Sequence, residues 1–231
     1  MTFEERAGAV RERMANAAVR AGRNPSDVLL VAVTKTRTVP EMLAAVPFAG
    51  AIGENRVQEA EGKKKSWPAG AVPSLPWRLI GHLQGNKARK ALELFDTVDS
   101  LDSIPLAERL DRVAGEMDRS LPVLIEVNMA QEASKTGIAL EGFDALLERV
   151  LILPHLCLEG LMTIGPLVEN EAGVRRAFAG LRELAGKARA RSGLPLPILS
   201  MGMSGDFEWA IQEGSTMVRI GSALFGPRNY G

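Results

Sequence analysis

The order of apolar and amphipathic segments predicts an α/β protein whose parallel sheet closes into a single (β/α)8 barrel of the TIM type. Eight short apolar runs each neighbour a segment of helical periodicity, which is the pattern of parallel strands joined by helices. The length of 231 residues suits one barrel domain, so we expect residues 1–231 to form one domain. An open, doubly wound sheet is the competing topology, but no apolar run is followed by the GxGxxG pattern.

The elements follow from local signals. Thr2 and Glu5 have the spacing of a capping box, and apolar residues then recur at helical period until Gly22, where a glycine ends the first helix. The predicted strands cover residues 29–34, 51–53, 77–80, 97–98 with flanking residues, 123–128, 156–163, 198–200 and 217–220. The helical patterns between them cover residues 39–46, 57–65, 86–94, 104–117, 142–151, 171–192 and 206–213. The loop at 68–76 is too short to link two domains.

Composition excludes several classes of partner. The chain has 28 Lys and Arg residues against 28 Asp and Glu residues, so no overall field attracts nucleic acid or an anionic membrane. The basic run 63–65 is interpreted as a solvated helix end. The single cysteine, Cys157, suits a reducing compartment and lies in an apolar run, which predicts a buried, inert thiol. No signal peptide or membrane span is evident, so we expect a cytoplasmic protein.

Lys35 follows the first apolar strand and is the first candidate for chemistry. Strand side chains alternate, so Val31, Val33 and Lys35 share one face, and the lysine lies where a buried strand reaches the mouth of the core. Partial desolvation at such a place favours a neutral amine, the form that attacks a carbonyl to make a Schiff base. The alternative is a lysine that merely ends a strand and reaches solvent.

Small residues gather after the seventh and eighth strands. The sequence SMGMSGD at 200–206 leads into a helix, and RIGSALFG follows at 219–226. In barrel enzymes the loops after these two strands often hold a phosphate, which glycine N–H groups and serine hydroxyls can bind. The alternative is a pair of ordinary turns capped by serine and aspartate.

Other strand ends supply Asn55, His82, Asn128, Met162 and Thr163. A methionine such as Met162 is also typical core filler. His82 has no cysteine or carboxylate cluster beside it in the sequence, so no metal site is expected. Neither a GxSxG motif nor a P-loop occurs, which argues against serine hydrolases and NTPases.

Seven segments in this order resemble one known family over essentially the whole chain. They are VAVTK (31–35), GENRVQE (53–59), IGHLQGNK (80–87), ASKTG (133–137), GLMT (160–163), LSMGMSGD (199–206) and VRIGSALFG (218–226). The chain is similar to the pyridoxal phosphate homeostasis proteins. One departure is Trp77-Arg78, where the family has an aromatic-His pair. We expect little effect on ligand binding, because this position is at the end of the strand far from the mouth.

The resemblance implies a fold-type III barrel for pyridoxal 5'-phosphate (PLP), like the N-terminal domain of alanine racemase. The cofactor-binding residues that it implies are Lys35, Asn55, Met162, Ser200, Ser204, Arg219, Gly221 and Ser222. Lys35 would form the Schiff base, and Arg219 would face the pyridine nitrogen. The three serines and Gly221 would hold the phosphate, and Asn55 would line the site.

The resemblance also bears on whether the protein is an enzyme. Arginine only donates hydrogen bonds, so its contact leaves the pyridine nitrogen unprotonated and makes PLP a poorer electron sink. Racemases also use a tyrosine from a further domain, whereas this chain is expected to stop after the barrel, with Tyr230 as its one tyrosine. We expect a monomeric, non-catalytic protein that stores PLP and delivers it to apo PLP-dependent enzymes. The alternatives are an amino-acid racemase or other fold-type III PLP enzyme, and a Schiff-base aldolase without cofactor.

Overall fold

Eight parallel strands form a closed barrel in sequence order, as the sequence predicts. The computed structural model describes residues 1–68, 75–130, 132, 136–166 and 170–227. Its strands are β1 (Leu29–Val33), β2 (Ala51–Glu54), β3 (Trp77–Leu79), β4 (Thr97–Leu101), β5 (Leu121–Glu126), β6 (Leu156–Met162), β7 (Ile198–Ser200) and β8 (Met217–Ile220). Strand β8 pairs with β1, which closes the sheet and leaves no edge.

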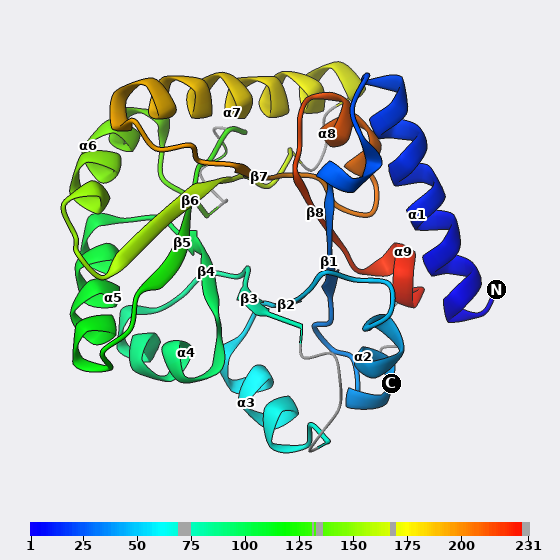
Figure 1. Cartoon of the computed structure of the whole chain (residues 1–231), viewed down its shortest axis with the longest axis horizontal. Helices are drawn as coiled ribbons and strands as arrows, with labels where there is room; N and C mark the ends of the chain where they lie inside the picture. The colour runs from blue at the N-terminus through cyan, green and yellow to red at the C-terminus, as the bar shows by residue number, and fades with distance from the viewer. Residues whose placement is uncertain (69–74, 131, 133–135, 167–169, 228–231) are drawn as a thin grey trace.

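Helices surround the strands, as Figure 1 shows. They are α1 (Phe3–Arg20), α2 (Val39–Ala45), α3 (Val57–Lys65), α4 (Ala88–Leu94), α5 (Ile104–Glu116), α6 (Leu140–Leu151), α7 (Glu171–Ser192), α8 (Phe207–Gln212) and α9 (Ser222–Phe225). Short 3-10 turns lie at Pro25–Asp27 (η1) and Gly85–Lys87 (η2). The one-turn helix α9 is absent from the prediction, because four residues are too few for a periodic signal.

Helix α1 precedes the barrel and lies on its outside against α8 and α9 (Figure 1). Its predicted capping box is present: the Glu5 N–H donates to Thr2 Oγ1, and the Thr2 N–H donates to the Glu5 carboxylate. The helix buries Val10 and Met14 in a cluster with Val218 and Phe207, so α1 covers the junction where the barrel closes.

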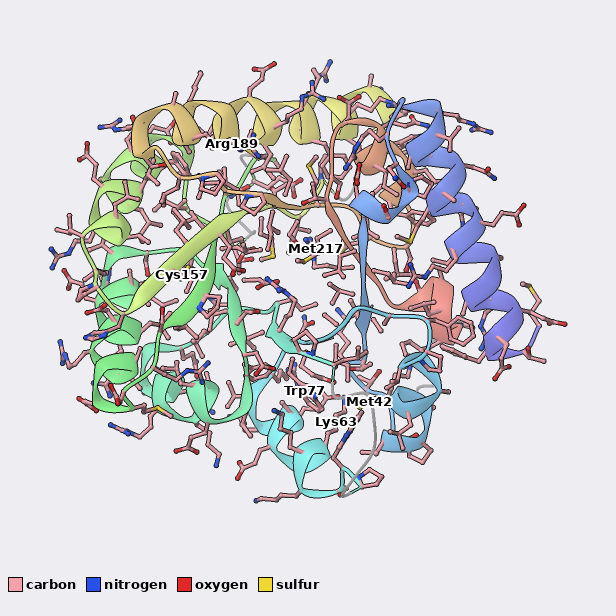
Figure 2. The ribbon with its side chains drawn as sticks, viewed as in Figure 1. Met42, Lys63, Trp77, Cys157, Arg189 and Met217 are labelled. Carbon is pink, nitrogen blue, oxygen red and sulfur yellow. The ribbon has the colours of Figure 1, made fainter. Side chains whose placement is uncertain are left out.

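Alternation along the strands separates the barrel interior from the layer under the helices. In β1, Leu30 faces the cluster beneath α1, whereas Val31 packs inside the barrel with Ala51 and Met217. Figure 2 labels Met217 within the ring of strands. At Gly160 a Cβ atom would lie 1.9 Å from the Ile198 carbonyl oxygen, so only glycine allows this approach of β6 to β7.

Two expectations about burial are wrong. Cys157 is exposed, because it is the second residue of β6, and this strand is fully covered only toward its carboxyl end. Lys63 is buried and bound to carboxylates, so the basic run is not a uniformly solvated helix end. The neighbouring Lys65, at the end of α3, does fit the expectation, with 74% of its side chain exposed.

The departure at Arg78 lies inside the barrel. Its guanidinium forms two hydrogen bonds to Asp99 on β4, at 2.8 and 2.9 Å, and both side chains are buried.

Among the described helices, none is both long enough and apolar enough to span a membrane. The predicted loop at 69–74, Lys135 within the ASKTG segment, and Tyr230 lie outside the described residues.

Candidate functional site

A cavity of about 330 Å³ opens at the carboxyl ends of the strands, where barrel proteins hold their ligands. Six of the eight predicted cofactor-binding residues line it: Lys35, Asn55, Ser204, Arg219, Gly221 and Ser222. These residues come from four places far apart in the sequence, after β1, after β2, after β7 and on or after β8. Closure of the barrel brings them together.

Lys35 and Asn55 follow neighbouring strands on one side of the cavity. Lys35 is partly buried two residues after β1, as its alternation with Val33 predicts. Asn55 directly follows β2, and the chain after β3 lies so close that a Cβ at Gly81 would be 2.4 Å from the Asn55 carbonyl oxygen. Asn55 Oδ1 is buried and has no hydrogen-bond partner among the described residues. This acceptor therefore suits a ligand that donates a hydrogen bond.

Hydroxyl and N–H groups meet in the part of the cavity wall that the loops after β7 and β8 form. The N–H groups of Gly221 and Ala223 point at Ser204 Oγ, at 3.3 and 3.1 Å. The β7–α8 turn that carries Ser204 requires Gly202, whose φ is +97° and whose Cβ would lie 2.6 Å from Ala210. Converging N–H groups and serine hydroxyls are what a phosphate group needs. In this structure the Ser204 hydroxyl oxygen accepts the hydrogen bonds of both N–H groups.

Arg219 is a buried cation in the cavity wall. Its Nη1 donates to Ser200 Oγ at 2.7 Å, and its Nη2 donates to the Thr163 carbonyl oxygen at 2.9 Å. Burial lowers the pKa of this guanidinium, while the negative charges of Asp99 and Glu126 oppose the change. Arginine stays protonated in proteins, so this group offers a fixed hydrogen-bond donor to a ligand.

Two predicted residues are not on the cavity wall. Ser200 is fully buried, and its hydroxyl accepts from Arg219, so it supports the arginine rather than the serine-rich end. Met162 is fully buried at the end of β6, opposite Ser200 in the sheet register. Ser200 is the last residue of β7 and Met162 the last residue of β6, and neighbouring residues cover both side chains completely.

Several residues of the wall were not predicted. Val33, Ile80, Ile164 and Met203 supply an apolar surface, and Arg37 adds a second guanidinium at the mouth. Arg37 Nη2 donates to the Gly226 carbonyl oxygen at 2.9 Å, which ties the loop after β1 to the segment after α9. Alternation from Lys35 could have indicated Val33, but nothing local marks Arg37, because its role depends on a contact 189 residues away.

The other strand-end candidates lie outside the cavity wall. His82 is half exposed, with Nδ1 2.9 Å from Asp102 Oδ2. Asn128 Nδ2 donates to the Glu132 carbonyl oxygen. Glu126, at the end of β5, accepts a hydrogen bond from Thr136 at 2.6 Å, and burial raises the pKa of its carboxyl above the ordinary value of 4.5.

The fold and the site define a (β/α)8 barrel protein with a strand-end lysine, a buried arginine and a phosphate-compatible end in one cavity. Residues 7–229 match the family model of the alanine racemase N-terminal domain. Two curated relatives are named pyridoxal phosphate homeostasis protein. The one from Pseudomonas aeruginosa is 44% identical, with 100% of this chain and 97% of the relative covered. The one from Escherichia coli K12 is 42% identical, with 96% and 94% covered. The chain belongs to the pyridoxal phosphate homeostasis protein family.

Solved structures agree with this assignment. PipY of Synechococcus elongatus PCC7942 with PLP bound has a TM-score of 0.81 and 39% identity, covering 94% of this chain and 100% of PipY. A protein of unknown function from Bifidobacterium adolescentis has a TM-score of 0.88 and 39% identity, with 96% and 94% covered. An alanine racemase of Clostridium difficile 630 in complex with cycloserine shares the fold, with a TM-score of 0.71 at 13% identity, over 95% of this chain and 60% of the racemase.

Proposed function

We propose that the protein binds PLP at the barrel mouth through a Schiff base on Lys35, and that it stores and delivers PLP without turning over amino acids. One observation carries the proposal: Lys35, Arg219 and the end formed by Ser204, Gly221 and Ser222 line the same cavity. A relative of known structure, PipY, is described with PLP bound, and this supports the same ligand here.

The residues fit the parts of PLP in a definite order. The phosphate would lie against Ser204 and Ser222, where the N–H groups after β8 converge. The Arg219 guanidinium would donate to the pyridine nitrogen, and the buried Asn55 Oδ1 would accept from a donor on the ligand. The neutral Lys35 amine would add to the aldehyde carbon, and one water molecule would leave as the C=N bond forms. Hydrolysis takes up one water molecule and returns the aldehyde, so storage is reversible.

The same arrangement argues for a carrier rather than an enzyme. Arg219 is held by Ser200 and by the Thr163 carbonyl oxygen, so it stays in place as a donor. A donor at the pyridine nitrogen keeps that nitrogen unprotonated, which weakens PLP as an electron sink. The proposed recipients are apo PLP-dependent enzymes, and the proposed form is a monomer in the cytoplasm.

Reduction with borohydride tests the proposal. The wild-type protein loaded with PLP should carry one reduced pyridoxyl group on the peptide that contains Lys35, found by mass spectrometry. Lys35→Ala should lose this label and the visible absorbance, whereas the control Lys87→Ala, at η2, should keep both. Labelling mainly at Lys87 or Lys135 would contradict the assignment.

Transfer is tested separately. The PLP-loaded protein is mixed with an apo PLP-dependent enzyme, and recovery of that enzyme's activity is followed beside an equal concentration of free PLP. Recovery by the wild type supports delivery. Failure to reactivate any recipient would leave storage without delivery.

A further inference from the structure

A buried lysine on α3, Lys63, is linked to both chain neighbours of Lys35, directly to Thr34 and through a carboxylate to Thr36. Figure 2 labels it among the side chains of α3. The Lys63 ammonium donates to the Thr34 carbonyl oxygen at 2.7 Å and to the carboxylates of Glu54 and Glu59 at 2.6 Å each. An ammonium has three N–H donors, so all three are used. This arrangement fixes the ammonium between the barrel and its helix.

The two carboxylates continue the network to the residues on either side of Lys35. Glu54 accepts from the Thr34 hydroxyl at 2.5 Å, and Glu59 accepts from the Thr36 N–H at 2.5 Å. Both neighbours of Lys35 in the chain are therefore tied to one cation. Lys35 is the residue in the middle of this clamp, which we define as Lys63, Glu54 and Glu59.

The backbone after Lys35 needs such support. Thr36 has a φ of +64°, in the left-handed region that is unfavourable for a β-branched residue. Strain of this kind persists only where the surroundings hold it, and it is concentrated at functional sites. The hydrogen bond that the Thr36 N–H donates to the Glu59 carboxylate holds this conformation, so the chain turns sharply directly after Lys35.

A second ion pair on the same helix separates this role from ordinary helix stabilisation. Lys65 pairs with Glu61 at 3.0 Å with the same i, i+4 spacing as Lys63 and Glu59. Lys65 is 74% exposed, whereas Lys63 is 9% exposed, and only the Lys63 pair reaches the loop after β1. The buried pair therefore does something for that loop which the exposed pair does not.

We propose that Lys63, acting through Glu54 and Glu59, is a positioning residue that sets the direction of the Lys35 side chain toward the bound aldehyde. This inference rests on the proposed Schiff base at Lys35. A clamp on both flanks fixes where the Lys35 amine lies, so it sets the rate at which the covalent bond forms and the fraction of PLP that is bound covalently.

The test replaces the ammonium by a side chain of similar length. Lys63→Met and the control Lys65→Met are loaded with PLP, and the visible absorbance, the rate of its appearance and the borohydride label on Lys35 are measured. Lys63→Met should form the bond at least about tenfold more slowly, because a misplacement of about 1 Å can slow an oriented reaction about a hundredfold. Lys65→Met should match the wild type.

Variants at Glu59 keep the test decisive if Lys63→Met does not fold. Glu59→Ala removes the acceptor of the Thr36 N–H and should slow bond formation. Glu59→Gln retains an oxygen there and should recover most of the rate. The two variants are compared at an equal melting temperature, so that a difference in rate does not come from stability. Normal rates in Lys63→Met and in Glu59→Ala would overturn the clamp while leaving Lys35 as the bonding residue. Absence of a label on Lys35 in the wild type would instead refute the proposed function.

Discussion

Ser200→Ala separates two roles for this serine, one in binding phosphate and one in supporting Arg219. The resemblance to the family implies the phosphate role, whereas the structure buries Ser200 fully and places its hydroxyl 2.7 Å from Arg219 Nη1. The substitution removes the acceptor of a buried, charged donor and changes little else in size. It therefore addresses one hydrogen bond.

The expected magnitude follows from that hydrogen bond. A hydrogen bond to a charged group contributes about 1.5–3 kcal/mol, and Arg219 is 4% exposed, so water does not replace the lost acceptor. Ligand-free Ser200→Ala should lose about that much unfolding free energy. For a chain of this size the melting temperature falls by roughly 2–4 °C per kcal/mol, so a decrease of about 3–12 °C is expected.

The assay combines urea unfolding of the ligand-free protein with binding of PLP and of pyridoxal, which lacks the phosphate. Ser200→Ala should weaken both ligands alike, because in the proposed binding mode Arg219 would face the ring that they share. Ser204→Ala is the matched comparison, since its hydroxyl lies on the cavity wall. It should weaken PLP more than pyridoxal by about tenfold to a hundredfold, which corresponds to the loss of one charged hydrogen bond.

One combination of results would refute this reasoning. If Ser200→Ala unfolds within about 0.5 kcal/mol of the wild type, the scatter of neutral substitutions, the bond to Arg219 contributes nothing. If the same variant also weakens PLP selectively over pyridoxal, Ser200 contacts the phosphate.

Three further predictions concern buried charges and activity. Burial raises the pKa of the Glu126 carboxyl above 4.5, so this carboxyl binds a proton more tightly in the folded protein than in the unfolded chain. The free energy of unfolding therefore falls as the pH rises from 4.5 through the raised pKa. Glu126→Gln removes this term, so urea unfolding should show the variant gaining stability relative to the wild type across that window; a relative loss would contradict the shift. Arg78→Met leaves the Asp99 charge buried without its partner and should cost about 3–5 kcal/mol in urea unfolding, whereas adding Asp99→Leu should restore part of it; an equal or larger cost in the double variant would contradict this account. The PLP-loaded protein should not racemise L- or D-amino acids in a chiral assay, and robust racemisation that Lys35→Ala abolishes would overturn the carrier proposal.

Local patterns in the sequence determined the architecture. The bounds of β7, β8, α3 and α7 agree with prediction, because periodicity and capping are set by residues close in the chain. Alternation along β1 also placed Lys35 at the mouth, since a strand exposes alternate faces whatever surrounds it. The glycine- and serine-rich loops were also predicted to lie at the mouth and do line the cavity, because turn chemistry is local. The roles of these residues toward PLP stay predictions.

Only the tertiary structure decided which buried polar groups meet. Ser200 and Arg219 are neighbours because β7 and β8 lie side by side. Lys63 is buried because α3 packs against the end of β2, where its ammonium binds Glu54. Arg37 reaches the cavity through a contact with the far end of the chain. A lysine or serine reads the same in a sequence whether it is solvated or bound to a buried partner. The difference is the loss of water on burial, and that depends on closure of the whole barrel.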